Sequence, residues 1–266
     1  MRAQTAQVVR WASTSSRSSS VATLPGKLRL VAVDDRGAYV VDEDAGWNRL
    51  IVVGLSDGAV QGEIRAPDVS TEAFGPRRSV VDAESGRLFT LARHEDSERL
   101  ELLGTDLRGR EVTLRVPLEG IPDLGVGMVL SMDGKHVFVY FPAGPHLVDV
   151  DLLNQRASLL GLDQAGDNSG LPAEGNLLAE DPKGKLLYLA LPSAGVAVVS
   201  QSPLQPLREL ATDRRYRAIG ISSDGGSLYT LGFDGAYRVF DAVSGVQRAT
   251  RGQLRAVDIL QVTAGE

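Results

Sequence analysis

The sequence contains no cysteine, few aromatic residues and no long apolar run, and each of these absences excludes something. Because no cysteine occurs among 266 residues, disulfide bonds, thiolate metal sites and cysteine nucleophiles are all ruled out. Without a run of about 18 apolar residues, no transmembrane helix is expected and a soluble protein is favoured. Tryptophan, tyrosine and phenylalanine make up only 5% of the chain, but hydrophobic residues reach 43%, which is enough for a sizeable core.

Positive charge is scarce overall and is unevenly placed. The chain has 28 Lys and Arg against 34 Asp and Glu, a net charge of −6, so we expect no nucleic-acid partner and no attraction to an anionic membrane surface. Residues 1–27 nevertheless hold four basic residues and no acid. This Ser/Arg-rich arm lacks the apolar core of a secretory signal, and its composition resembles a mitochondrial presequence. A disordered or linker-like arm is the favoured interpretation, because the serine-rich residues 13–20 bury too little apolar surface to fold alone.

One aromatic residue recurs near the start of an apolar run at a regular interval. Tyr39, Phe89, Phe138, Tyr188 and Tyr229 are separated by 50, 49, 50 and 41 residues. Each follows a polar or acidic turn that contains glycine and is preceded by another apolar run, which is the pattern of a β-hairpin. A period of 40 to 50 residues is typical of propeller repeats built from four-stranded blades.

The apolar runs also indicate sheets that are covered on both faces. Residues 50–53, 196–199 and 219–221 are almost continuously apolar, whereas a strand with one face in water would alternate. Stacked blades cover each sheet in this way. We therefore predict an all-β fold, a β-propeller of four-stranded antiparallel blades. Five complete units are expected at residues 28–66, 77–117, 127–161, 176–211 and 217–252. Residues 253–266 would supply a closing strand or part of a sixth blade, and a truncated seven-bladed ring is an open alternative.

The turns carry a resemblance to known repeats. Ser131, Asp133 and Gly134 with Phe138 follow a Ser-x-Asp-Gly pattern ending in an aromatic, and residues 222–229 are similar. These segments resemble the YVTN and WD-type repeats of β-propellers, and residues 31–42 resemble an NHL-type blade. The resemblance covers roughly residues 28–252 and implies the fold. It implies no single function, because such folds host binding scaffolds, lactonases, oxidoreductases and sensors.

The connections between strands divide into two sets. First-to-second and third-to-fourth turns are short and closed by glycine, and they share one face of a propeller, here called the short-turn face. Second-to-third and blade-to-blade connections are longer and differ from one another, and they share the opposite face, here called the loop face. Because variable loops on a rigid scaffold carry most binding residues, we expect a site on the loop face.

Candidate ligand-binding residues on the loop face are aromatic, cationic or titratable. Aromatic side chains anchor protein partners, arginines bind carboxylates or phosphates through paired hydrogen bonds, and histidines titrate near neutral pH. The candidates are Trp47, Arg78, His94, His146, Tyr216, Arg217 and Phe233.

Candidate metal ligands are few. Asp42 and Asp44 have the alternating spacing of the first half of a calcium loop, but Val53 stands where that loop needs a bidentate glutamate. Asp163 and Asp167 offer further oxygen ligands in a long loop. Solvated acidic turns are the favoured interpretation, so no cofactor is expected, and calcium or another divalent cation is the alternative.

Two classes of function fit these observations. The first is a non-enzymatic binding protein whose loop face engages a protein or peptide partner through an exposed aromatic patch. The alternative is a metal-dependent propeller hydrolase of the lactonase or esterase kind, with loop carboxylates holding the cation. A further alternative is a fragment of an extracytoplasmic sensor. No catalytic residue is predicted.

Overall fold

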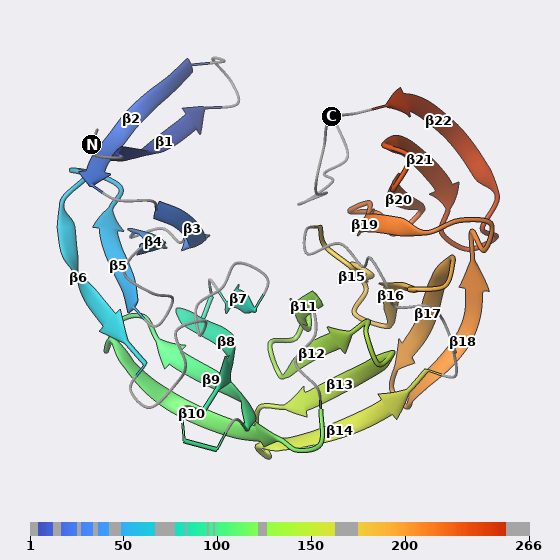
Figure 1. The fold of residues 1–266 in the computed structure, drawn as a ribbon, viewed down its shortest axis with the longest axis horizontal. Helices are drawn as coiled ribbons and strands as arrows, with labels where there is room; N and C mark the ends of the chain where they lie inside the picture. The colour runs from blue at the N-terminus through green and yellow to red at the C-terminus, as the bar shows by residue number, and fades with distance from the viewer. Residues whose placement is uncertain are drawn as a thin grey trace. The chain divides into compact units, whose positions relative to one another are not determined.

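A computed structural model gives the fold of the chain (Figure 1). It describes residues 5–12, 17–25, 28–33, 37–42, 49–66, 78–82, 84–94, 96–97, 99–121, 127–162 and 175–253. The chain divides into two compact units, Met1–Ile121 and Pro122–Glu266, and each is described by itself. In the described residues no helix has the length and hydropathy needed to cross a membrane.

The first unit contains one two-stranded sheet and two four-stranded sheets, all antiparallel and connected in chain order. The two-stranded sheet consists of β1 (Thr5–Ala12) and β2 (Arg17–Pro25). The next sheet contains β3 (Leu28–Val33), β4 (Gly37–Asp42), β5 (Arg49–Gly54) and β6 (Val60–Arg65). The last contains β7 (Ser79–Asp82), β8 (Arg87–Arg93), β9 (Leu100–Asp106) and β10 (Glu111–Leu118).

The N-terminal arm contains a pair of strands. β1 and β2 pair from Thr5 opposite Pro25 to Ala12 opposite Arg17, with a register shift after Val8. Backbone hydrogen bonds between two strands do not depend on side-chain hydrophobicity. Ser18, Ser19 and Ser20 thus contribute to a strand despite their polarity.

The second unit contains three four-stranded antiparallel sheets, again in chain order. The first has β11 (Gly127–Leu130), β12 (His136–Phe141), β13 (His146–Asp151) and β14 (Arg156–Gly161). The second has β15 (Leu178–Glu180), β16 (Leu186–Ala190), β17 (Val196–Gln201) and β18 (Leu204–Leu210). The third has β19 (Tyr216–Ile221), β20 (Ser227–Gly232), β21 (Ala236–Asp241) and β22 (Gln247–Gln253).

Burial within each sheet follows the position of the strand. In the β11–β14 sheet, residues 137–141 of the second strand are all buried, while residues 156–159 of the fourth strand are all exposed. Each fourth strand is the outer edge of its sheet, and in the second unit the first strand β15 contacts the first strands of both neighbouring sheets, β11 and β19. The middle strands therefore form the core between sheets, and the predicted all-β fold of four-stranded blades is confirmed.

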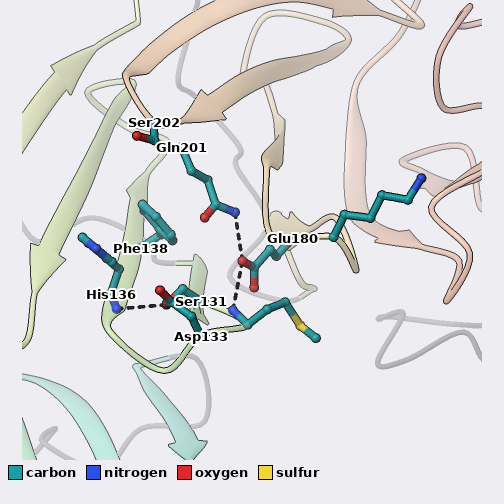
Figure 2. A pocket seen from close by; sticks show the side chains of 10 residues that line it. Ser131, Asp133, His136, Phe138, Glu180, Gln201 and Ser202 are labelled. Carbon is teal, nitrogen blue, oxygen red and sulfur yellow. Dashed lines mark hydrogen bonds between the residues drawn. The ribbon is translucent and has the colours of Figure 1, made fainter.

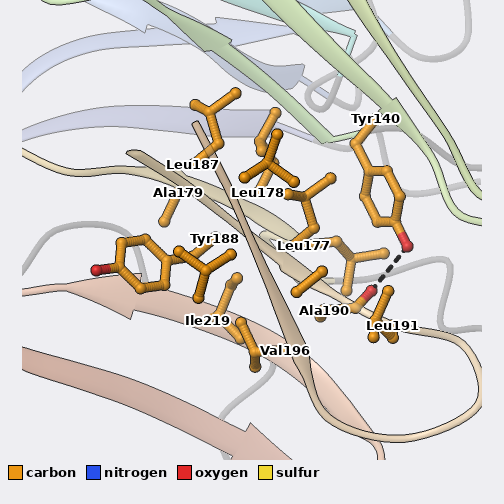
Figure 3. Close-up of a cluster of buried hydrophobic side chains, with 14 of the residues drawn as sticks. Tyr140, Leu177, Leu178, Ala179, Leu187, Tyr188, Ala190, Leu191, Val196 and Ile219 are labelled. Carbon is orange, nitrogen blue, oxygen red and sulfur yellow. Dashed lines mark hydrogen bonds between the residues drawn. The ribbon is translucent and has the colours of Figure 1, made fainter. Parts of the chain in front are cut away.

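The largest buried cluster of the second unit is centred on the β15–β18 sheet (Figure 3). Leu187, Tyr188 and Val196 of this sheet belong to it, together with Tyr140 of β12 and Ile219 of β19. The Tyr140 hydroxyl is buried and donates a hydrogen bond of 3.0 Å to the Ala190 carbonyl oxygen, so it links β12 to the end of β16. This bond satisfies a polar group that the core would otherwise leave unpaired.

Candidate functional site

The site is built on turns that follow the first strand of each sheet in the second unit. After β11, the Ser131 hydroxyl donates to Asp133 Oδ1 at 2.7 Å and accepts from the His136 N–H at 2.9 Å. After β19, Ser222 bonds in the same way to Asp224 and to the Ser227 N–H. These hydrogen bonds lower the pKa of Asp133 and of Asp224, with the serine hydroxyl as the main cause in each. The hydroxyls of Ser131 and Ser222 therefore stabilise the turns through hydrogen bonds within them.

The turn after β15 departs from this pattern. Asp181 takes the place of the serine, and Lys183 that of the aspartate, while the backbone bond from the Gly184 N–H to the Asp181 carbonyl is kept at 2.8 Å. Asp181 is only 6% exposed. A Cβ atom on Gly225 would stand 2.7 Å from Asp181 Oδ1, so the turns of neighbouring sheets lie in close contact.

A pocket of about 440 Å³ opens beside this turn, between the β11–β14 and β15–β18 sheets (Figure 2). Its walls come from the two first-to-second turns, the start of β12 and the end of β17, so it lies on the short-turn face of the second unit. The lining residues are Ser131, Met132, Asp133, His136, Phe138, Glu180, Lys183, Gly184, Gln201 and Ser202.

Glu180, the last residue of β15, is the half-buried carboxylate of this pocket. Its Oε1 accepts a hydrogen bond from Gln201 Nε2 at 2.9 Å and another from the Met132 N–H at 3.1 Å (Figure 2). Burial raises the pKa of Glu180 above its ordinary value, the two hydrogen bonds oppose this, and the charges of Asp133 and Asp181 raise it further. The two neighbouring carboxylates thus disfavour the charge of Glu180, and a cationic group placed against Glu180 would stabilise it.

His136 forms the opposite wall together with Phe138. Its Nδ1 lies 2.7 Å from Asp149 Oδ1 on the adjacent strand β13, which fixes the ring orientation. The imidazole is stacked with the Phe138 ring, with centroids 6.0 Å apart and an interplanar angle of 10°. Because Phe138 is 1% exposed, the histidine ring covers an apolar surface at this wall.

A second pocket, of about 430 Å³, runs along the first strands β11, β15 and β19. It shares Met132 and Glu180 with the first pocket and is otherwise lined largely by apolar residues, among them Met128, Leu178 and Ile221. Met132 is 65% exposed and lies where the two pockets meet. The two residues therefore mark the junction of a polar pocket and an apolar one.

Several residues proposed from the sequence lie outside the described part of the chain, namely Trp47, Asp44, Asp163 and Asp167. Asp42 ends β4 and is half-buried. Arg78 immediately precedes β7, and His94 follows β8. Within the described residues, no group of three or more His, Asp or Glu side chains is placed to hold a metal ion.

The other predicted residues lie at the loop face of the second unit, at the start of strands or in a second-to-third turn. His146 begins β13, Tyr216 and Arg217 begin β19, and Phe233 lies in the turn after β20. Phe233 is 43% exposed, and the Arg215 guanidinium lies 5.1 Å from its ring centroid. The Nδ1 atoms of His94 and His146 are buried and have no hydrogen-bond partner among the described residues.

The expectation that Tyr216 belongs to an exposed aromatic patch is wrong. Its side chain is 2% exposed, lies edge-on to Phe240 and donates a hydrogen bond of 3.2 Å to the Ala211 carbonyl oxygen. Burial raises its pKa to about 12. Its charged neighbours in the sequence suggested a surface loop, but β19 begins at Tyr216 and the strand turns this ring into the core.

Sequence analysis did not identify Glu180, Gln201 or His136 as residues of a pocket. One signal was present, because Asp181-Pro182-Lys183-Gly184 breaks the Ser-x-Asp-Gly pattern that the turns on either side keep. A repeat unit that deviates from its neighbours on an otherwise uniform face is a reasonable place to look for function.

Comparison with known proteins supports the fold and goes no further. No known family model matches the chain, and no curated protein sequence matches it. Among solved structures, the chain is similar to the hydrazine synthase of Kuenenia stuttgartiensis, with a TM-score of 0.61 over 77% of this chain and 68% of that chain. The sequence identity is 18%, so the similarity concerns the fold alone. Together with the five four-stranded sheets, it places the chain among proteins with a β-propeller-type fold.

Proposed function

We propose that this chain is a non-enzymatic β-propeller binding protein, of the YVTN, NHL or WD-like kind, that engages a protein or peptide partner at the Glu180 pocket. The observation that carries the proposal is the pairing of a half-buried carboxylate with an exposed methionine at one opening. Protein partners are commonly held by a charged or aromatic anchor beside an adaptable apolar contact.

The chemistry of the pocket favours a partner with a cationic side chain. Glu180 is already held by two hydrogen bonds, so a lysine or arginine from the partner would meet a carboxylate of fixed position. Asp133 and Asp181 add negative charge nearby. The aliphatic stem of such a side chain would lie against Met132, while its charged end replaces water at the carboxylate.

The proposal moves the main contact surface from the loop face to the short-turn face. Trp47, Arg78, Arg217 and Phe233 stay predictions for a second contact surface on the loop face. The hydrolase alternative rests on Asp42, Asp44, Asp163 and Asp167, and its test is thermal unfolding with and without calcium, magnesium or zinc. A shift of several degrees that Asp42→Asn abolishes would favour that alternative.

Synthetic peptides provide the direct test. Fluorescence anisotropy would compare labelled alanine-rich heptapeptides that carry Arg, Lys, Leu or Glu at the centre and apolar residues beside it. We expect the Arg and Lys peptides to bind at least tenfold more tightly than the Glu peptide, and expect Glu180→Gln to remove this difference. Added salt should weaken binding, since the contact is electrostatic.

The matched control is Glu111→Gln, at an exposed carboxylate that begins β10 in the first unit. This variant removes the same charge elsewhere, so its peptide affinities should equal those of the wild type. Equal affinity of the wild type for Arg and Glu peptides, or equal loss in both variants, would reject the pocket as the binding site.

A further inference from the structure

The outer strands of the five four-stranded sheets differ in whether a β-bulge interrupts them, and this difference affects their ability to pair with a strand of another chain. An outer strand has one edge of unpaired backbone N–H and C=O groups, which invites pairing with another chain unless a bulge, a proline or a charge disrupts it. In four sheets the register between third and fourth strands skips a residue of the outer strand, which is the mark of a β-bulge. The skipped residues are Gln61 on β6, Thr113 on β10, Leu207 on β18, and Arg248 and Gly252 on β22.

The fifth outer strand, β14, has no such interruption. Its six residues pair with β13 in unbroken register from Arg156 opposite Asp151 to Gly161 opposite His146. It also contains no proline, unlike β10 with Pro117 and β18 with Pro206. β14 ends the sheet order β11-β12-β13-β14, and no described strand is hydrogen-bonded to its outer edge.

The outward hydrogen-bonding groups of β14 can be assigned from the register. The Leu162 N–H donates to the Pro145 carbonyl oxygen at 2.8 Å, just beyond the end of the strand. Because hydrogen-bonded and non-bonded pairs alternate in an antiparallel ladder, Arg156, Ser158 and Leu160 bond to β13. Ala157, Leu159 and Gly161 therefore direct their N–H and C=O groups away from the sheet.

The side chains of β14 are exposed to solvent as well. Residues 156–159 are all exposed, and Leu159 keeps 55% of its surface in water. Arg156, at the very end, is the one charged residue within the strand. An unbroken edge with an exposed leucine at its centre and almost no charge lacks the features that keep edge strands apart.

We propose that β14 pairs antiparallel with β14 of a second copy of this chain, about a two-fold axis through Leu159. In this register Leu159 faces Leu159, Ala157 faces Gly161, and each outward N–H meets an outward carbonyl of the other copy. Arg156 falls opposite Leu162, so no like charges meet. The strand is self-complementary in sequence and in hydrogen bonding, which favours a second copy over an unrelated peptide.

The contact between the two strands is small. Six residues from each copy bury less than the roughly 1,000 Å² that a stable interface needs, so the dimer should be weak and should form at high concentration. This proposal is independent of the Glu180 pocket and would stand if no peptide bound there.

Sedimentation of the full chain over a wide concentration range tests the proposal. We expect a reversible monomer–dimer equilibrium in the wild type that Leu159→Lys weakens at least tenfold. The matched control is Leu207→Lys, which puts the same charge on an outer-strand leucine of similar exposure, 47%, on the bulged strand β18. It should leave the equilibrium unchanged.

A second variant guards against misfolding of the first. Ala157→Pro removes one outward N–H without touching a bond to β13, so the sheet should form while dimerisation is lost. Because the chain has no cysteine, Leu159→Cys yields a single thiol that mild oxidation should join to its counterpart across the axis, whereas Leu207→Cys should stay monomeric. A wild type that stays monomeric throughout, or a dimer that survives both Leu159→Lys and Ala157→Pro, would overturn the proposal.

Discussion

The backbone N–H of Met132 donates a hydrogen bond of 3.1 Å to the Glu180 carboxylate, and the two residues, 48 positions apart, belong to neighbouring sheets of the second unit. The same oxygen accepts a bond from Gln201 Nε2. One side chain therefore joins a turn of the β11–β14 sheet to two strands of the β15–β18 sheet. It stabilises the sheet contact and shapes the pocket at once.

Glu180→Gln should separate the charge of this residue from its hydrogen bonds. Because the folded-state pKa is raised above the ordinary 4.5, the ionised carboxylate costs folding free energy at neutral pH, and this cost disappears as the pH falls through the raised pKa. The glutamine variant should therefore be at least as stable as the wild type at pH 7, with its relative stability decreasing toward pH 4.5. Urea unfolding at several pH values measures this.

Glu180→Ala is the comparison variant, since it removes the acceptor as well as the charge. We expect it to lower the free energy of unfolding by about 1–3 kcal/mol at pH 7, because the Met132 N–H and Gln201 lose their partner. If both variants were destabilised equally and at every pH, the charge of Glu180 would have no part in stability.

Gly225→Ala tests the contact between neighbouring turns. Gly225 has a φ of 74°, and an added Cβ would stand 2.7 Å from the oxygen of the buried Asp181. Gly120→Ala is the control, because φ is 73° but nothing lies within 4 Å of the new atom. The control should cost about 1 kcal/mol from backbone strain alone, and Gly225→Ala clearly more.

The additional loss of stability in Gly225→Ala, relative to Gly120→Ala, should depend on Asp181. Adding Asp181→Ala to Gly225→Ala should recover part of the loss, which a double-mutant cycle in chemical denaturation measures as a coupling energy. Purely additive effects would mean that the two turns do not press on each other.

The Asp234–Arg238 pair should govern part of the acid sensitivity of the β19–β22 sheet. Arg238 is 5% exposed and bonds to both oxygens of Asp234, at 2.5 and 3.1 Å, which lowers the pKa of Asp234 to about 2. A lowered pKa contributes stability that is complete above the ordinary value near 4 and is lost as the pH falls toward 2. The stability difference between wild type and Asp234→Asn should therefore shrink over this range.

Removing either partner should have unequal effects. Asp234→Ala leaves a buried guanidinium without its carboxylate, whereas Arg238→Met leaves a half-exposed carboxylate that water can solvate. We expect the first variant to be less stable than the second by about 1 kcal/mol or more at pH 7, measured by urea unfolding. The reverse order would show that Arg238 matters mainly through the packing of its stem.

The strand pattern of the fold is encoded locally, which explains why it is readable from the sequence. Turns such as Ser222-Ser223-Asp224-Gly225 specify their own geometry through short-range hydrogen bonds, and Gly225 supplies the positive φ. Continuous apolar runs such as residues 196–199 indicate sheets covered on both faces, and every residue of this run is buried. The repeat period, the hydrogen bonds of the turns and the burial of the apolar runs thus each depend on residues that are close together in the sequence.

The pocket and the edges were decided by tertiary structure. Glu180 becomes a half-buried carboxylate only because Met132 and Gln201, far away in the sequence, are brought to it by neighbouring sheets and strands. Tyr216 enters the core although its neighbours are charged, because the direction of a side chain depends on where its strand begins. The unbroken edge of β14 is likewise visible only in the register with β13. By itself the sequence determined the elements and their order, since those depend on local hydrogen bonding and hydrophobicity, whereas the surroundings of each polar group depend on contacts between distant segments.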